Sequence, residues 1–116
     1  MNNLTDIGYI KELLGRHNFS FSKGLGQNFL VNPSVCPRIA EMGGVGKGVG
    51  VIEVGTGIGV LTKELALRAD KVVAVEIDER LLPVLEETLS EFDNIKIINE
   101  DIMKVDLKKL IEDEFE

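Results

Sequence analysis

The stretch VIEVGTGIGVLT, residues 51–62, decides the fold of this chain. It begins as an apolar, β-branched run typical of a buried strand and continues as a helical pattern. Three glycines, Gly55, Gly57 and Gly59, lie between the two patterns. A helix start carries unpaired backbone N–H groups, and glycines let a ligand approach them closely. The stretch therefore predicts a strand, a turn and a helix, with glycines that serve either a ligand or packing alone.

Strand and helix patterns alternate on both sides of this turn. Strand patterns cover residues 49–54, 71–76 and 94–99, helical patterns cover 58–69 and 79–92, and LKKLIEDEFE (107–116) reads as a short amphipathic helix. Short links between alternating elements predict right-handed crossovers and a parallel sheet, hence an α/β fold. Pro83 removes a backbone donor near the start of its helix, so we expect that helix to begin late or to tighten there.

Two helices are expected before the sheet. Apolar residues recur at helical spacing over residues 6–15, behind Thr5 as a good N-cap residue. In residues 32–44 we expect Asn32 to cap a second helix and Pro33 to occupy its first position. The glycine-rich residues that follow lack the spacing of a phosphate-binding loop and are interpreted as a connector.

Composition limits the class of protein. The 116 residues are 44% hydrophobic and 28% charged, as in one small globular domain, and neither a signal peptide nor a membrane span is expected, which favours the cytoplasm. The single cysteine, Cys36, rules out an intrachain disulfide and a multi-cysteine metal site. The net charge of −7 opposes nucleic-acid binding, but residues 1–48 hold five Lys or Arg against three Asp or Glu, so a basic face there stays open.

The glycine spacing bears on which ligand the turn could hold. Gly55, Gly57 and Gly59 form Gly-x-Gly-x-Gly, whereas the dinucleotide fingerprint is Gly-x-Gly-x-x-Gly, and Val60 stands where that fingerprint has its third glycine. Glu76 ends the second strand, where its carboxylate can accept both hydroxyls of a ribose lying over the turn. The pattern favours an adenosine-bearing ligand other than a dinucleotide.

Further carboxylates follow the neighbouring strands. Asp101 comes after the third strand, where it can accept a hydrogen bond from an adenine amino group, with Ile77 and Ile102 as apolar walls. Glu53 adds a carboxylate beside the turn, well placed for a cationic sulfonium and ammonium. Each alone would be a solvated strand-end carboxylate, but together, at consecutive carboxyl ends of a parallel sheet, they describe an adenosine pocket.

These motifs resemble a known family. EVGTGIGVLT, the Glu76 strand end and the turn EDI (100–102) resemble the S-adenosylmethionine sites of class I methyltransferases. KGLGQNFLVNP (23–33) narrows the resemblance to the KsgA-type ribosomal RNA adenine dimethyltransferases and their relatives, the Erm resistance methyltransferases and the mitochondrial transcription factor B proteins. The resemblance extends from about Ile7 to Leu110.

The resemblance implies a truncated Rossmann-like class I methyltransferase fold and transfer of methyl groups from S-adenosylmethionine to the N6 atoms of two adjacent adenines in 16S ribosomal RNA. Residues expected to bind the cofactor are Asn28, Leu30, Gly55, Gly57, Glu76, Ile77, Asp101 and Ile102. Lys23 and Arg16, with His17, Phe19 and Phe21 nearby, could form an RNA surface, although solvated loop residues would look the same. From the residues alone, Phe29 and Leu30 would ordinarily be an apolar plug, and the resemblance reverses that preference.

The family's catalytic signature, an Asn-Leu-Pro-Tyr turn after a fourth strand, is absent from the 116 residues. We therefore expect no catalytic residue in this chain and no methylation by it alone. Residues 1–48 would supply N-terminal helices and a contacting loop, and residues 49–116 the first half of the methyltransferase domain. We expect strand order 3-2-1, with strand 49–54 as an exposed edge that invites pairing with a second copy.

Three other functions stay open from the sequence. A class I methyltransferase could act on a small molecule or a protein, although the GQNFL loop argues against it. The chain could be a non-catalytic module that binds cofactor or RNA. It could also bind NAD, but Val60 disfavours this because the dinucleotide fingerprint has a glycine at that position.

Overall fold

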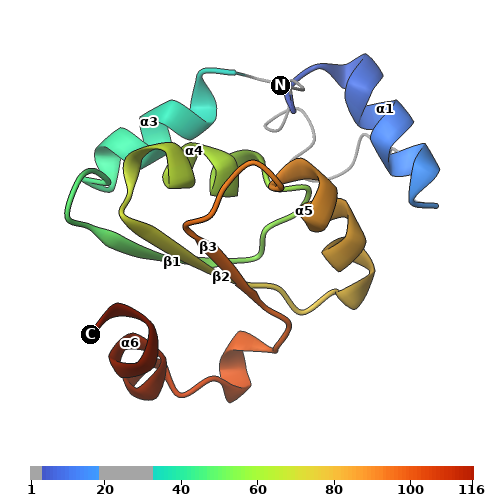
Figure 1. Ribbon diagram of the computed structural model, residues 1–116. Coiled ribbons are helices and arrows are strands. Elements are labelled where there is room, and N and C mark those ends of the chain that lie inside the picture. The colour runs from blue at the N-terminus through green and yellow to red at the C-terminus, as the bar shows by residue number, and fades with distance from the viewer. Residues whose placement is uncertain (1–3, 19–32) are drawn as a thin grey trace.

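The computed structural model describes residues 4–18 and 33–116 and has an α/β fold (Figure 1). The elements in chain order are α1 (Ile7–Arg16), α3 (Val35–Met42), β1 (Gly50–Val54), α4 (Val60–Arg68), β2 (Lys71–Val75), the 3-10 helix η1 (Glu79–Leu81), α5 (Leu82–Thr88), β3 (Ile95–Ile98), the 3-10 helix η2 (Ile102–Lys104) and α6 (Leu107–Phe115). Figure 1 shows α3, α4 and α5 on one side of the sheet and α6 on the other.

The sheet has three parallel strands in the order β1-β2-β3, which confirms the predicted order. Val54 pairs with Val75, and Val75 pairs with Ile98, so the three strands end at the same level. The central strand β2 is buried on both faces, and its residues 72–75 are at most 2% exposed. A continuous apolar run is the sequence pattern that such a strand requires, because helices cover both of its faces.

β1 is an edge strand, as expected, since among the described strands it pairs with β2 alone. The expectation that it is left exposed is only partly right. α6 packs on one face of β1, and its Phe115 ring lies so close to Gly50 that a Cβ atom there would clash with it. A short amphipathic helix after β3 has to bury its apolar side, and this face of the sheet is within reach. Pairing of the free edge with a second copy stays a prediction.

The N-cap of α1 lies one residue later in the chain than predicted. Asp6, not Thr5, is the N-cap: its backbone is extended, and its carboxylate accepts a hydrogen bond from the Gly8 N–H at 3.0 Å. Both residue types cap well, and the backbone conformation of the folded chain selects between them.

α3 begins at Val35, with Ser34 as its N-cap, so the prediction that Pro33 occupies the first helical position is wrong. A start at Pro33 would put Pro37 at the fifth position, where its missing N–H would break a helical hydrogen bond. The observed start puts Pro37 in the first turn, where no such bond is lost. The proposed cap Asn32 lies outside the described residues.

The helix after β2 tightens where Pro83 predicts it. The 3-10 helix η1 comes first along the chain. α5 follows it from Leu82, with Pro83 in its second position, where no helical hydrogen bond is lost. Asp78 caps η1 by accepting a hydrogen bond from the Arg80 N–H at 3.0 Å.

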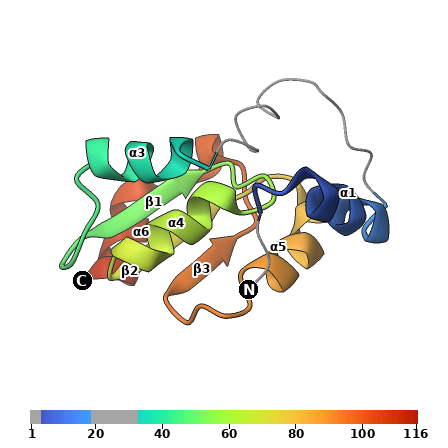
Figure 2. The same ribbon diagram turned by 90° about the horizontal axis from the view of Figure 1, so that it is seen from above.

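Two apolar clusters form the core. One joins the apolar face of α1 to the start of α4 and to α5; its buried members are Leu4, Ile10, Leu13, Leu14, Cys36, Ile58, Val60 and Val84. The other joins α3, α4 and β2 through Ala40, Leu65, Ala66, Ala69 and Val72. Both views place α1 beside α5 (Figure 1 and Figure 2), so the N-terminal helix packs against the helix that follows β2. None of the helices that the structure describes has the length and apolar character needed to cross a bilayer.

Candidate functional site at the carboxyl end of the sheet

The structure brings the predicted site residues of β1, β2 and β3 to one end of the sheet. The Gly55 N–H donates to the Val75 carbonyl and the Glu76 N–H to the Ile98 carbonyl, both at 2.9 Å. The Glu100 N–H donates back to the Glu76 carbonyl at 3.2 Å. The residues that leave the three strands are therefore neighbours, which is where ligands bind in open α/β sheets.

The glycine turn, residues 55–59, holds three glycines in the left-handed region, at φ values of 80°, 54° and 96° for Gly55, Gly57 and Gly59. A Cβ atom added at Gly55 or Gly57 would meet nothing within 4 Å. At Gly59 it would lie 3.1 Å from Thr88 Oγ1 and 3.3 Å from Leu85 Cδ2. The first two glycines thus border open space, whereas the third lets α5 pack against the turn.

Glu76 lies behind the glycine turn, is 5% exposed and is held by hydrogen bonds from the residues around it. Its Oε1 accepts from the Thr56 N–H at 2.8 Å and from the Thr56 hydroxyl at 2.7 Å, and its Oε2 accepts from the Asp78 N–H at 2.9 Å. Burial raises the pKa of Glu76, but the hydrogen bonds from Asp78, Thr56 and the Gly57 backbone outweigh it and hold the pKa below its usual value. Glu76 is therefore an ionised carboxylate.

Asp101 is half-buried at the start of η2, and its Oδ1 accepts a hydrogen bond from the Met103 N–H at 2.9 Å. Among the described residues no hydrogen bond occupies its second carboxylate oxygen. Ile102 beside it is partly buried, and Ile77 is 66% exposed. The two isoleucines thus leave apolar surface near the ends of β2 and β3.

Asn99 is a further residue at this end of the sheet that sequence reasoning missed. Its side-chain amide donates to the Glu76 carbonyl at 2.8 Å and to the Ile77 carbonyl at 3.4 Å, so it ties the ends of β2 and β3 together. The available signal was an asparagine immediately after a buried strand, two residues before the proposed adenine acceptor Asp101.

Glu53 lies on β1 just before the turn and is 7% exposed. It accepts a hydrogen bond from the hydroxyl of Thr62, a fully buried residue of α4. Burial raises the pKa of Glu53 to about 7, the Thr62 hydrogen bond opposes this rise, and the negative charge of Glu76 adds to it. The sequence predicts a carboxylate at this position. In the folded chain burial keeps the Glu53 carboxyl only partly ionised near neutral pH.

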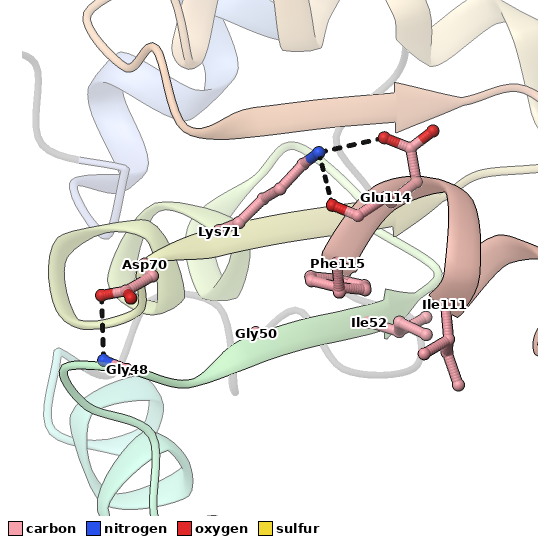
Figure 3. Close-up of a pocket in the computed structure, with 8 residues that line it drawn as sticks. All are labelled: Gly48, Gly50, Ile52, Asp70, Lys71, Ile111, Glu114 and Phe115. Carbon is pink, nitrogen blue, oxygen red and sulfur yellow. Dashed lines mark hydrogen bonds and ion pairs between the residues drawn. The ribbon is translucent and has the colours of Figure 1, made fainter.

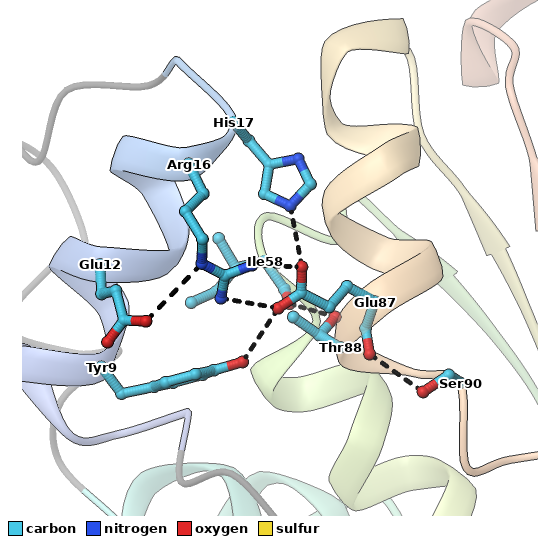
Figure 4. A network of polar contacts seen from close by, with 8 residues as sticks. All are labelled: Tyr9, Glu12, Arg16, His17, Ile58, Glu87, Thr88 and Ser90. Carbon is cyan, nitrogen blue, oxygen red and sulfur yellow. Dashed lines mark hydrogen bonds and ion pairs between the residues drawn. The ribbon is translucent and has the colours of Figure 1, made fainter.

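Arg16, expected at an RNA surface, forms a bidentate ion pair with Glu87 of α5 (Figure 4). Both N–O distances are 2.8 Å, and Glu87 also accepts from His17 Nε2 at 3.1 Å and from the Tyr9 hydroxyl at 3.5 Å. The hydrogen bonds from Arg16 and His17 lower the pKa of Glu87 to about 2. Part of the predicted basic surface is thus engaged within the chain, and a role in RNA binding stays a prediction.

Several predicted contacts lie outside the described residues. These are Lys23 of the proposed RNA surface with Phe19 and Phe21, and Asn28 and Leu30 of the proposed cofactor loop. Within residues 4–18 and 33–116, no group of three or more His, Cys, Asp or Glu side chains is arranged to hold a metal ion.

A cavity of about 510 Å³ lies away from these residues, between β1, the start of β2 and α6 (Figure 3). Figure 3 shows Phe115 over Gly50 and Ile111 beside Ile52, and the Lys71 ammonium is bonded to Glu114 Oε1 at 3.0 Å. The lining contains none of the predicted site residues. Lys71 and Glu114 are paired with each other and Asp70 accepts a hydrogen bond from the Gly48 N–H, so the chemistry expected of a cofactor site lies at the other end of the sheet.

Comparison with known proteins identifies the family. Residues 18–116 match the family described as ribosomal RNA adenine dimethylase. The chain is 50% identical over 106 residues to ribosomal RNA small subunit methyltransferase A of Bacillus licheniformis, covering 91% of this chain and 36% of the relative. It is 52% identical over 108 residues to the protein of the same name from Geobacillus thermodenitrificans, covering 93% of this chain and 37% of the relative. The chain thus spans just over a third of the length of these relatives.

The fold agrees with solved methyltransferase structures. The 23S rRNA methyltransferase ErmE superposes with a TM-score of 0.58 at 42% identity, over 62% of this chain and 30% of that one. These matches confirm the resemblance drawn from EVGTGIGVLT and GQNFL and the Rossmann-like class I methyltransferase fold. The chain belongs to the ribosomal RNA adenine dimethylase family.

Proposed function

We propose that this chain supplies the S-adenosylmethionine-binding half of a cytoplasmic enzyme that dimethylates N6 of two adjacent adenines in 16S ribosomal RNA of the small ribosomal subunit. One observation carries the proposal: the open glycines Gly55 and Gly57, the ionised Glu76 and the half-buried Asp101 meet at one end of a parallel sheet. Family membership and the names of the relatives support the substrate and the reaction.

The residues present fit the adenosine part of this cofactor. Glu76 Oε2 would accept hydroxyls of the ribose, and the free oxygen of Asp101 would accept the adenine amino group. Ile77 and Ile102 would flank the adenine ring. Gly55 and Gly57 would let the ligand lie against the turn because no side chain occupies that space.

The cofactor supplies an electrophilic methyl group on a sulfonium. This chain would hold that cation beside two carboxyl groups, Glu76 and the partly ionised Glu53, whose negative potential favours it over a neutral thioether. The family's Asn-Leu-Pro-Tyr turn does not occur in these 116 residues, so we expect cofactor binding and no methyl transfer by this chain alone.

Isothermal titration of the chain with S-adenosylmethionine, S-adenosylhomocysteine and NAD tests the proposal. We expect the first two to bind and NAD to leave the signal unchanged. Asp101→Asn keeps an oxygen for the η2 cap but presents an N–H₂ donor to the adenine amino group, so we expect affinity to fall about tenfold or more. Asp113→Asn, at an exposed position of α6, is the matched control. Binding of NAD alone, or equal affinity in the Asp101→Asn chain, contradicts the proposed site.

A further inference from the structure

We propose that Thr88 of α5 is a positioning residue for the glycine turn. It would fix the turn conformation that the cofactor meets without touching the cofactor. This inference rests on the proposed function, since it assigns the turn of that same site a support from a distant part of the chain.

The contact is a buried hydrogen bond. Thr88 Oγ1 donates to the Ile58 carbonyl at 2.9 Å, and both residues are buried, at 7% and 4% exposure (Figure 4). The helical ladder of α4 starts one residue later, where the Lys63 N–H donates to the Gly59 carbonyl at 2.9 Å. Ile58 is therefore not an acceptor of the helix, and its buried carbonyl depends on Thr88.

The same contact explains the third glycine. A Cβ atom at Gly59 would lie 3.1 Å from Thr88 Oγ1, so the absence of a side chain at Gly59 is what lets the Thr88 hydroxyl approach the turn. Gly55 and Gly57, whose Cβ positions are open, have no such neighbour among the described residues. The Gly-x-Gly-x-Gly spacing thus combines two glycines beside open space with one that admits α5.

A turn with three glycines needs such support because glycine has the widest choice of backbone conformations and loses the most entropy when it is fixed. The turn is fixed at two points. Thr56 is held to Glu76 through its N–H and its hydroxyl, and Ile58 is held to Thr88 through its carbonyl. Gly57 lies between these two points and its backbone also hydrogen-bonds to Glu76, so its open face has a set direction before any ligand arrives, which reduces the entropic cost of binding.

α5 is itself anchored at this position. Glu87, the residue before Thr88, accepts hydrogen bonds from Arg16, His17 and Tyr9 of the α1 region (Figure 4). The Ile58 side chain packs in the cluster that holds the apolar face of α1. The turn residue Ile58 is thus fixed through its carbonyl by α5 and through its side chain by the cluster that includes α1.

The test compares three variants by titration with S-adenosylhomocysteine, at a temperature where circular dichroism shows each variant folded. Thr88→Val keeps the shape and removes the donor, and we expect affinity to fall about tenfold. Thr88→Ser restores the hydroxyl, and we expect affinity to return to within about twofold of the unaltered chain. Ser90→Ala removes an exposed hydroxyl that donates to the Glu87 carbonyl at 3.1 Å, and should leave affinity unchanged.

A merely structural role gives a different result: Thr88→Val would lower the melting temperature and leave the affinity of the folded protein unchanged, which overturns the proposal. If the unaltered chain binds neither S-adenosylmethionine nor S-adenosylhomocysteine, the proposed function fails for this chain, and amide hydrogen exchange of Gly57 and Gly59 then decides the role of Thr88. Thr88→Val should speed this exchange about tenfold while Thr88→Ser and Ser90→Ala do not, in line with loss of one buried hydrogen bond. Equal exchange in all variants would overturn the positioning role.

Discussion

Glutamates hold key hydrogen bonds in two regions of the molecule, the carboxyl end of the sheet and the contact between α1 and α5, but their surroundings differ. Glu53 and Glu76 both expose little surface to solvent, but Glu53 lies deeper in the protein; its pKa is raised to about 7, and that of Glu76 is lowered. Glu53 accepts a hydrogen bond from Thr62, whereas Glu76 accepts hydrogen bonds from Thr56, Asp78 and the Gly57 backbone. Glu87, a third exposed, has its pKa lowered to about 2 by the Arg16 and His17 side chains. Deeper burial raises the pKa of Glu53, several donors hold that of Glu76 low, and exposure limits how much the charge of Glu87 affects stability.

Glu53 gives the largest expected effect. Its pKa is about 7 in the folded chain against an ordinary value of 4.5, so the folded state binds the proton more tightly and stability falls as pH rises from 4.5 to 7. The shift corresponds to about 3 kcal/mol. Glu53→Gln removes this titration, so urea unfolding over that pH range should show the variant gaining about 3 kcal/mol relative to the unaltered chain as pH rises.

Glu112→Gln, at an exposed position of α6, is the control for charge removal and should follow the unaltered chain. A difference between Glu53→Gln and the unaltered chain that does not change with pH would mean that Glu53 stays ionised in the folded state.

The next effect separates the two kinds of glycine in the turn. Gly57→Ala and Gly59→Ala both place a side chain at positive φ, which costs about 1 kcal/mol. Gly59→Ala also forces Thr88 and Leu85 to move, so we expect a total loss of about 2 kcal/mol in the free energy of unfolding. In titration with S-adenosylhomocysteine, Gly57→Ala should weaken binding despite its smaller loss of stability. Equal losses of stability would contradict the packing role of Gly59.

The smallest effect is expected between α1 and α5. Glu87→Gln breaks the bidentate pair with Arg16, and because the carboxylate is a third exposed we expect a loss of only about 1 kcal/mol at neutral pH. The contribution is present above pH 4.5 and disappears as pH falls towards about 2, since the folded-state pKa is lowered.

Salt distinguishes this surface pair from the buried carboxyls. The loss in Glu87→Gln should shrink between about 0.05 M and about 1 M sodium chloride, because ions screen exposed pairs. Glu86→Gln, on the exposed side of the same helix, should change little. A salt-independent loss would show that the pair acts as a buried one.

Much of this fold could be predicted because local patterns carry it. The continuous apolar runs place all three strands within a residue of their observed limits, and Pro83 marks the tightened start of its helix. The helix starts before the sheet were predicted less accurately: Asp6, not Thr5, is the cap of α1, and α3 begins two residues after Pro33. Neighbouring residues that cap equally well, or a second proline, leave a start undetermined until the backbone conformation is fixed.

The properties of the candidate site also fall into those that the sequence predicts and those that depend on the folded structure. By itself, the sequence determined that glycines follow one strand and carboxylates follow the next two, and parallel strands must bring these to one end of a sheet. Only the tertiary structure decided that Gly59 admits α5, that Glu53 is near neutral while Glu76 is charged, and that Arg16 is paired with Glu87, 71 residues away. These properties depend on burial and on hydrogen bonds between segments far apart in the chain, and such contacts leave no periodic signal in the sequence around any one residue.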